Sequence, residues 1–168
     1  MSAQPRYALL FSTAVSALLL AGSAYADTTI HVSLWDKGPE SMVMDDAHMG
    51  MMGKMDMSMM ATAMMGVTPD RTSVPAGKIT FDVVNDSKDI IHEFLVAPVT
   101  ADQKELPYIV DENRVDEEAA SYLGEVSELD PGKSGSLTVD LAAGSYIVFC
   151  NIPGHFINGM WSILTVTP

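Results

Sequence analysis

The residues best suited to chemistry lie together near the C-terminus, in a loop between two strand-like runs. The loop reads Cys150-Asn-Ile-Pro-Gly-His155-Phe-Ile-Asn-Gly-Met160, which places a thiol, an imidazole and a thioether at the spacing Cys-x4-His-x4-Met. These soft or borderline donors together favour copper. Two histidines, one cysteine and a weak axial methionine form the blue-copper electron-transfer arrangement. A zinc site of one cysteine and two histidines is the alternative, and copper is preferred because zinc would not need Met160.

A blue-copper set needs a second histidine from another part of the chain. His92 is the candidate because it lies in a separate strand-like run, residues 90–97. Cys150 is the only cysteine, so it cannot form an internal disulfide, and metal ligation would explain a lone thiol in an oxidising compartment. Taken singly, each of these residues is more often a packed or hydrogen-bonded side chain than a ligand. Their joint spacing on a strand, loop and strand favours the metal site.

The loop, with Pro153 and Gly154 before its histidine, resembles the ligand loop of the cupredoxin family. The long gap between cysteine and histidine is similar to that of rusticyanin and sulfocyanin rather than plastocyanin. The resemblance covers roughly residues 65–168 plus one N-terminal strand. It implies one type 1 copper, and the ligands it implies are His92, Cys150, His155 and Met160.

The chain departs from many cupredoxins at the position after the upstream histidine. The family carries Asn there, bonded to a Ser or Thr beside the cysteine, whereas this chain has Glu93 and Asn151 at these positions. We expect the roles to be exchanged, with the Asn151 amide donating a hydrogen bond to the Glu93 carboxylate. Such a link would orient both ligand segments. The alternative is a solvated Glu93 without this partner.

The segments that must position these residues read as short strands. Apolar residues alternate with polar ones in a first run that exposes His31 and in several runs after Val67. About seven such strands, separated by turns, predict an all-β Greek-key β-sandwich. Residues 98–122 are acidic and weakly periodic, so we expect an excursion between the sheets, with a short helix near 116–122. Tyr146 is expected to anchor a corner through its hydroxyl.

Four segments make up the predicted organisation of the chain. Residues 1–26 read as a secretory signal, with Arg6, a short apolar stretch and an Ala-x-Ala cleavage site, and this signal suggests a bacterial periplasm. Residues 27–41 supply the first strand of the cupredoxin domain and residues 67–168 supply the rest. Between them, residues 42–66 form a flexible Met-rich insertion. We expect no stable membrane insertion once the signal has been cleaved.

The Met-rich insertion is unlike the rest of the chain. Methionine fills eleven of the 24 positions from 42 to 65, and Gly50, Gly53 and the following Gly66 weaken any helix there. Thioethers select Cu(I), and the segment resembles Met-rich segments of periplasmic copper-tolerance proteins, so additional Cu(I) could bind. The alternative is adaptable apolar packing or a partner surface. The candidate Cu(I) donors are His48, Met49, Met51, Met52, Met55, Met57, Met59 and Met60.

Charge and composition narrow the function. The formal net charge of −13 becomes −14 if residues 1–26 are removed, because Arg6 is their only charged residue. This charge argues against nucleic acid and anionic lipid as partners and favours a basic partner face. We expect a monomer that docks a redox protein near His155, whose ring edge should be exposed at the tip of the sandwich. Three apolar loop residues should exclude water and form a docking patch: Ile152, Phe156 and Ile157.

Two functions of different class follow. The first is one-electron transfer by a periplasmic type 1 copper protein. The alternative is copper tolerance, through capture or oxidation of Cu(I) by the Met-rich insertion. One cysteine is too few for a binuclear copper centre, and four histidines are too few for a multicopper oxidase or a copper nitrite reductase. We therefore do not expect an enzyme, apart from a weak possibility of Cu(I) oxidation.

Overall fold

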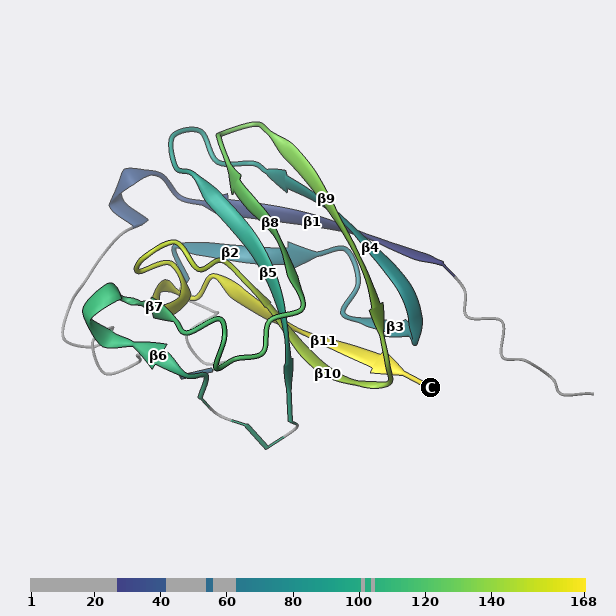
Figure 1. The fold of residues 1–168 in the computed structure, drawn as a ribbon. Helices are drawn as coiled ribbons and strands as arrows, with labels where there is room; N and C mark the ends of the chain where they lie inside the picture. Colours follow the sequence, from purple (N-terminus) through teal and green to yellow (C-terminus); the bar gives the residue numbers. More distant parts are fainter. Residues whose placement is uncertain (1–26, 42–53, 56–62, 101, 104) are drawn as a thin grey trace, which may run out of the picture.

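The protein is a β-sandwich with a small β-ribbon packed at one end (Figure 1). The computed structural model describes residues 27–41, 54–55, 63–100, 102–103 and 105–168. Its described part consists of strands in sheets and a few short 3-10 turns, so the all-β prediction is confirmed. No described helix is long and apolar enough to cross a membrane.

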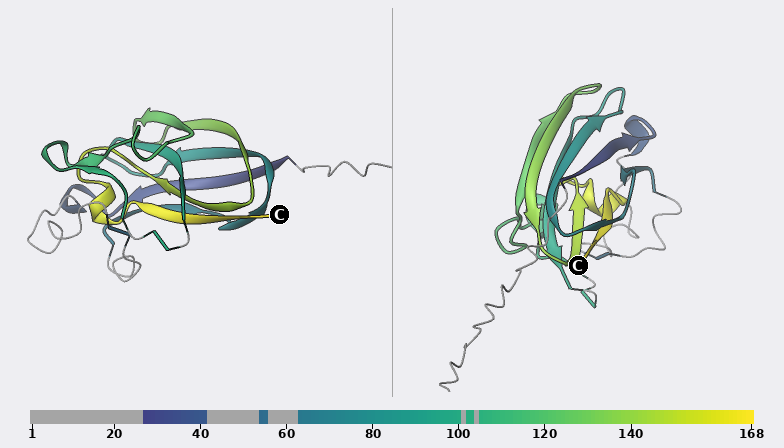
Figure 2. Two further views of the ribbon diagram at one scale, coloured as in Figure 1. Left: turned by 60° about the horizontal axis from the view of Figure 1, so that its bottom comes forward. Right: turned by 90° about the vertical axis from the view of Figure 1, so that its right-hand side faces the viewer.

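Two sheets form the layers of the sandwich, as the right-hand view of Figure 2 shows. The first sheet has the order β2 (Met65–Pro69), β1 (Thr28–Asp36), β4 (Gly77–Asn85) and β9 (Ser134–Leu141). The second has the order β3 (Ser73–Pro75), β11 (Trp161–Thr167), β10 (Gly144–Phe149), β5 (His92–Val99) and β8 (Gly124–Leu129). Strand β1 pairs with β4 in parallel, and β3 pairs with β11 in parallel. The other pairs are antiparallel.

Alternation of apolar and polar residues builds the inner core between the sheets. Strands β1 and β4 each turn every second residue inward, and this confirms the two strands predicted from that pattern. His31 faces solvent, as expected. The rings of Phe81 on β4 and Phe94 on β5 meet across the two sheets with their centroids 5.1 Å apart. The core residues of these three strands are Ile30, Val32, Leu34, Ile79, Phe81, Val83, Phe94 and Val96.

A second group of buried residues, here called the outer cluster, lies on the other face of β5 and β10. Because this face is covered too, the two strands are apolar at nearly every position instead of alternating. Residues from the segment after β5 and from the ligand loop complete the group. The outer cluster is Leu95, Ala97, Leu106, Val115, Ala120, Ile147, Phe149, Phe156, Ile157 and Trp161.

The segment between β5 and β8 supplies the cover over the outer cluster. Strands β6 (Tyr108–Ile109) and β7 (Arg114–Val115), joined by η3 (Val110–Glu112), form the β6–β7 ribbon. The helix expected near 116–122 was wrong: the backbone there makes a single turn, with the Ala120 N–H bonded to the Asp116 carbonyl at 2.9 Å. Ser121 within this turn is left-handed, at φ 54°, and a helix cannot continue through it.

Tyr146 forms the expected corner. Its hydroxyl donates to the Ala142 carbonyl at 2.9 Å, four residues upstream at the entry to β10. The bond fixes the turn that leads into the strand before Cys150. The ligand loop follows at the end of the sandwich opposite the start of β1 and the C-terminus, as Figure 1 and the left-hand view of Figure 2 both show.

Candidate metal centre

The loop after β10 is closed at its base by its own backbone. The Cys150 N–H donates to the Met160 carbonyl at 3.0 Å, and the Met160 N–H donates to the His155 carbonyl at 3.2 Å. Gly154 and Gly159 have φ values of 84° and 90°, which favour glycine, so both turns of the loop depend on these residues. A 3-10 turn, η4 (Phe156–Asn158), lies between them. These backbone hydrogen bonds hold the three predicted loop ligands, Cys150, His155 and Met160, close together.

Three donor atoms converge at the end of the sandwich. The imidazole nitrogens and the sulfur of His92, Cys150 and His155 lie within 4.8 Å of one another. The Nδ1 atoms of the two histidines are 3.2 Å apart, and His155 Nδ1 is 3.3 Å from Cys150 Sγ. His92 comes from the first residue of β5 and the other two come from the loop. Met160 is fully buried in the inner core at the foot of the same loop.

The surroundings keep these donors neutral and ready for a cation. Burial raises the pKa of the Cys150 thiol to about 12, although the N–H groups of Glu93 and Ile152 point to the sulfur. Burial and then the neighbouring His92 lower the pKa of His155 to about 3. Burial lowers the pKa of His92 as well, although Asp36 opposes this shift. Both imidazoles are therefore neutral at pH 7, and a bound cation would be needed to hold the cysteine as thiolate. Buried thiolate and imidazole donors suit copper or zinc.

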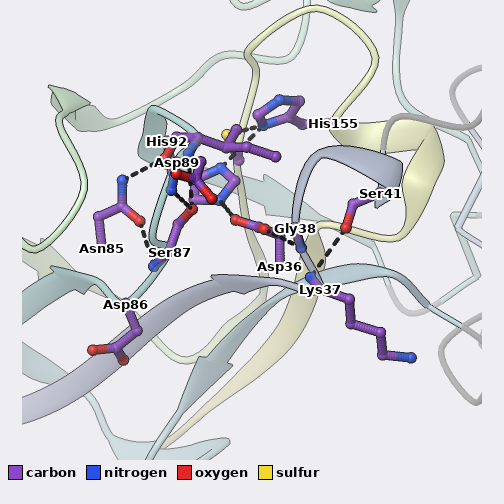
Figure 3. A network of polar contacts seen from close by, with 12 residues as sticks. Asp36, Lys37, Gly38, Ser41, Asn85, Asp86, Ser87, Asp89, His92 and His155 are labelled. Atoms are coloured by element: carbon purple, nitrogen blue, oxygen red, sulfur yellow. Dashed lines mark hydrogen bonds and ion pairs between the residues drawn. The ribbon is translucent and has the colours of Figure 1, made fainter.

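Sequence reasoning missed one buried acid at this centre. Asp36, the last residue of β1, lies 3.0 Å from His92 Nε2 through Oδ2, and its side chain is only 2% exposed (Figure 3). Burial acts to raise the pKa of Asp36, but hydrogen bonds from Ser87, His92 and the Gly38 N–H bring it below its usual value. Among 22 acidic residues, nothing in the sequence marks this one except its place at the end of an apolar strand.

The turn between β4 and β5 holds His92 from the other side. The Asn85 amide donates to the carbonyls of Ile90 at 2.9 Å and Leu129 at 2.7 Å. Asn85 Oδ1 accepts from the Ser87 N–H at 2.9 Å, and Ser87 Oγ accepts from the Ile90 N–H at 2.9 Å (Figure 3). A fully hydrogen-bonded turn of this kind fixes the entry to β5 and therefore the place of the imidazole.

The expected side-chain link from Asn151 to Glu93 is not made. The Asn151 side chain instead bonds Val115 and the Glu117 carboxylate, 2.8 Å away, while only its backbone N–H reaches the Glu93 carboxylate. The Glu93 N–H lies 3.4 Å from Cys150 Sγ. Burial, and then the charges of Glu117, Glu125 and Glu128, raise the pKa of Glu93 to about 7. The Asn151 side chain thus joins the ligand loop to the segment of the β6–β7 ribbon, while backbone N–H groups link the two ligand segments.

The expected exposed edge of His155 was wrong. His155 is 2% exposed, and Phe156 and Ile157 are nearly as deeply buried, so these two residues exclude water but form no surface patch. Ile152 packs against the inner core and is only partly exposed. The β6–β7 ribbon lies beside the loop: the Gly154 N–H donates to the Asn113 carbonyl at 2.8 Å, and the Tyr108 and Phe156 rings are 6.3 Å apart.

The Met-rich insertion falls mostly outside the described residues. This applies to His48, Met49, Met51, Met52, Met57, Met59 and Met60. Of its described methionines, Met55 packs against the outer cluster and Met65 is fully buried in the inner core as the first residue of β2. Lys54 pairs with Glu105 in a β-bridge, and Ala63 lies against Gly159. The described flanks therefore lie near the ligand loop.

Comparisons with known proteins identify a family match and several similar folds. Residues 72–168 match the model of the sulfocyanin (SoxE) domain. Auracyanin-B from Chloroflexus aurantiacus is 49% identical over 41 residues, which are 24% of this chain and 17% of that protein's length. Reduced rusticyanin superposes with a TM-score of 0.51 at 16% identity, over 84% of this chain and 81% of that chain. Rusticyanin from Thiobacillus ferrooxidans gives 0.50 at 16% identity, over 84% and 79%. At these identities the likeness to the solved structures concerns the fold.

Proposed function

Because the chain belongs to the sulfocyanin (SoxE) family, we propose that it is a periplasmic type 1 copper protein that carries single electrons between redox partners. One observation carries this proposal: the Nδ1 atoms of His92 and His155 and the sulfur of Cys150 are buried and lie close to one another. This donor set on a cupredoxin fold suits copper that alternates between two oxidation states.

We assign His92, Cys150 and His155 because their donor atoms lie close together, and Met160 because it is buried at the foot of the same loop. His92, Cys150 and His155 would form the trigonal set, and Met160 would be the weak axial donor. Bound copper would supply the one-electron redox chemistry. The chain's own part is to hold the four donors on closed backbone, to exclude water with Phe156 and Ile157, and to direct N–H groups at the sulfur. Fixed donors keep the reorganisation small, and this favours fast electron transfer.

The partner would dock over the β6–β7 ribbon rather than directly on His155. The ribbon contacts the loop through the hydrogen bond between Asn113 and Gly154, so it would offer a short electron-transfer path from the buried centre to the surface. Exposed Val110 lies beside Asp111 and Glu112, and Arg114 is the only cation between residues 108 and 118. An apolar side chain among acids suits a redox protein with a basic face, and attraction between them would weaken as salt increases.

Colour tests the copper assignment. Cu(II) added to the metal-free protein should give an intense blue or green absorption from charge transfer between thiolate and copper. Cys150→Ser and His92→Ala should abolish it, whereas His31→Ala should keep it, because His31 is an exposed histidine on β1. A colourless Cu(II)-loaded wild type would overturn the proposal. With a basic redox protein as acceptor, the rate of electron transfer should fall as the ionic strength rises.

One observation supports a second function, which is capture or oxidation of periplasmic Cu(I) through the Met-rich insertion. The described flanks of the insertion lie near the ligand loop, with Met55 on the outer cluster and Ala63 against Gly159. This function is compatible with electron transfer and has its own test below.

A further inference from the structure

We propose that Asp36 is a positioning residue for the metal centre, which selects the metal-binding tautomer of His92 and lowers the reduction potential through its buried negative charge. The proposal rests on the proposed copper site. It assigns to the end of β1 a part in a centre otherwise built from β5 and the ligand loop.

The tautomer follows from the hydrogen bond. An ionised carboxylate only accepts hydrogen bonds, so at 3.0 Å from Asp36 Oδ2 the His92 Nε2 must carry the proton. The other ring nitrogen, Nδ1, is then left with a free lone pair, and this is the atom that faces His155 and Cys150. A partner on the far nitrogen of a metal-binding histidine fixes both tautomer and ring orientation. Asp36 would therefore prepare His92 before any metal arrives.

The carboxylate itself is held from two sides. The Gly38 N–H donates to Oδ1 at 2.6 Å, and the Ser87 hydroxyl is a further donor. The turn after β1 is closed by Ser41 Oγ, which accepts from the Lys37 N–H at 3.0 Å (Figure 3). Ser41 Oγ also donates to the Met64 carbonyl at 3.0 Å. Asp36 thus bridges the turn after β1 and the turn before β5, and the strands β1 and β5 lie in different sheets.

The charge matters because the surroundings are dry. The side chains of both Asp36 and His92 are almost completely buried, so a negative charge here acts through a low effective dielectric constant. The His92 imidazole would lie between this charge and a metal held by its Nδ1. A fixed anion at that distance stabilises Cu(II) more than Cu(I), because Cu(II) carries the greater positive charge, and the reduction potential falls.

The Asp36→Asn variant tests whether Asp36 sets the His92 tautomer and the reduction potential or only stabilises the fold. An amide has one acceptor oxygen for two N–H donors, those of Gly38 and His92. If the oxygen stays with the short Gly38 bond, the amide NH2 faces His92 Nε2 and moves the ring proton to Nδ1. Copper binding must then displace this proton. The matched control is Asp86→Asn, which removes the same charge from an exposed side chain bonded to Ser33.

Two measurements decide the proposal. Nitrogen-15 NMR of the metal-free protein should show the Nε2–H tautomer of His92 in the wild type and in Asp86→Asn, and a shift toward Nδ1–H in Asp36→Asn. In copper-loaded protein, Asp36→Asn should lose at least tenfold more Cu(II) affinity than Cu(I) affinity, which corresponds to a rise of about 59 mV in potential. Asp86→Asn should leave the potential unchanged.

The contrary outcomes are distinct. If Asp36→Asn keeps the wild-type tautomer and potential and loses only stability, Asp36 is a structural bond between the sheets and the proposal is wrong. If the wild type takes up no Cu(II) with blue or green colour, the proposed copper function fails instead, and the NMR result still decides the effect on His92.

Discussion

The side chain of Asn151 and the backbone of Val115 exchange two hydrogen bonds. The Val115 N–H donates to Asn151 Oδ1 at 2.7 Å, and Asn151 Nδ2 donates to the Val115 carbonyl at 3.0 Å. The amide side chain thereby pairs with the backbone of β7 as a neighbouring strand would. Because Asn151 follows Cys150 directly, this pair of bonds joins the ribbon to the ligand loop at the thiol.

Asn151→Ala should loosen this junction. The change leaves the N–H and carbonyl of buried Val115 without these partners, which costs about 1–3 kcal/mol of unfolding free energy. Hydrogen exchange at the Val115 N–H should become faster in the variant. As a control, Asn158→Ala removes a bond to the Gly154 carbonyl within the loop and should leave Val115 protected. Unchanged exchange at Val115 in Asn151→Ala would contradict the proposed role of the amide.

Met160→Leu should keep the colour and raise the reduction potential. The swap nearly conserves volume, so it should cost less than about 1.5 kcal/mol of stability, while a weak donor to Cu(II) is lost. Met65→Leu is the control, since Met65 is also fully buried but lies outside the ligand loop. The potential of each copper-loaded variant should be measured against the wild type. Equal potentials for the two variants would rule out an axial role for Met160.

Glu93 should make the metal-free protein less stable as the pH rises toward 7. Its folded pKa of about 7 lies above the ordinary value of 4.5, so its stabilising contribution is complete below 4.5 and is lost as pH rises through 7. Glu93→Gln should therefore gain unfolding free energy over the wild type between these pH values. The gain should level off above pH 7 at about 1–2 kcal/mol, reduced because the carboxyl is partly exposed.

Urea unfolding of the metal-free proteins across pH 4 to pH 8 measures this difference. Glu118→Gln is a suitable control because it makes the same change at an exposed glutamate. A difference between Glu93→Gln and the wild type that is constant with pH would mean that Glu93 does not titrate in this range.

The Met-rich insertion should bind Cu(I) separately from the type 1 site. In a competition titration under reducing conditions, the intact protein should take up more Cu(I) than a variant with seven replaced methionines. Leucine retains apolar bulk but removes the thioether, so the loss of Cu(I) separates binding from packing. The Leu replacements are at Met49, Met51, Met52, Met55, Met57, Met59 and Met60.

This binding should depend little on pH, because a thioether has no proton to lose. The blue or green colour should stay unchanged in the leucine variant, since Cys150 and its partners are intact. Equal Cu(I) uptake by the two proteins would show that the insertion is packing or linker. His48→Ala, made alone, should weaken Cu(I) binding if this histidine adds a stronger donor at the N-terminal end.

Much of the fold was readable from local patterns, because alternation along β1, β4 and β9 reports one buried face and one exposed face. Strand β8 was missed because Val126 is its only buried residue among glutamates and a serine. The β6–β7 ribbon was missed for a related reason: its strands are two residues long, and they cover the outer cluster through a few side chains.

The loop residues of the site were predictable because their spacing is local. The contribution of Asp36 was not predictable, since it depends on the contact between the end of β1 and the start of β5. These strands lie in different sheets and meet only in the folded chain. The burial of His155 was missed for the same reason, because the ribbon beside the loop is distant in sequence. Pairings between distant segments decide which face of a loop meets solvent, and local sequence carries little information about them.

The position of Pro168 at the end of the sandwich opposite the ligand loop has a practical consequence for how the molecule can be attached. A tether fused after Pro168 would hold the protein upright, with His92, Cys150 and the β6–β7 ribbon directed away from the support. On an electrode, that orientation would place the length of the sandwich between metal centre and conductor. Direct electronic contact would then be slow, whereas soluble partners would keep free access to the ribbon.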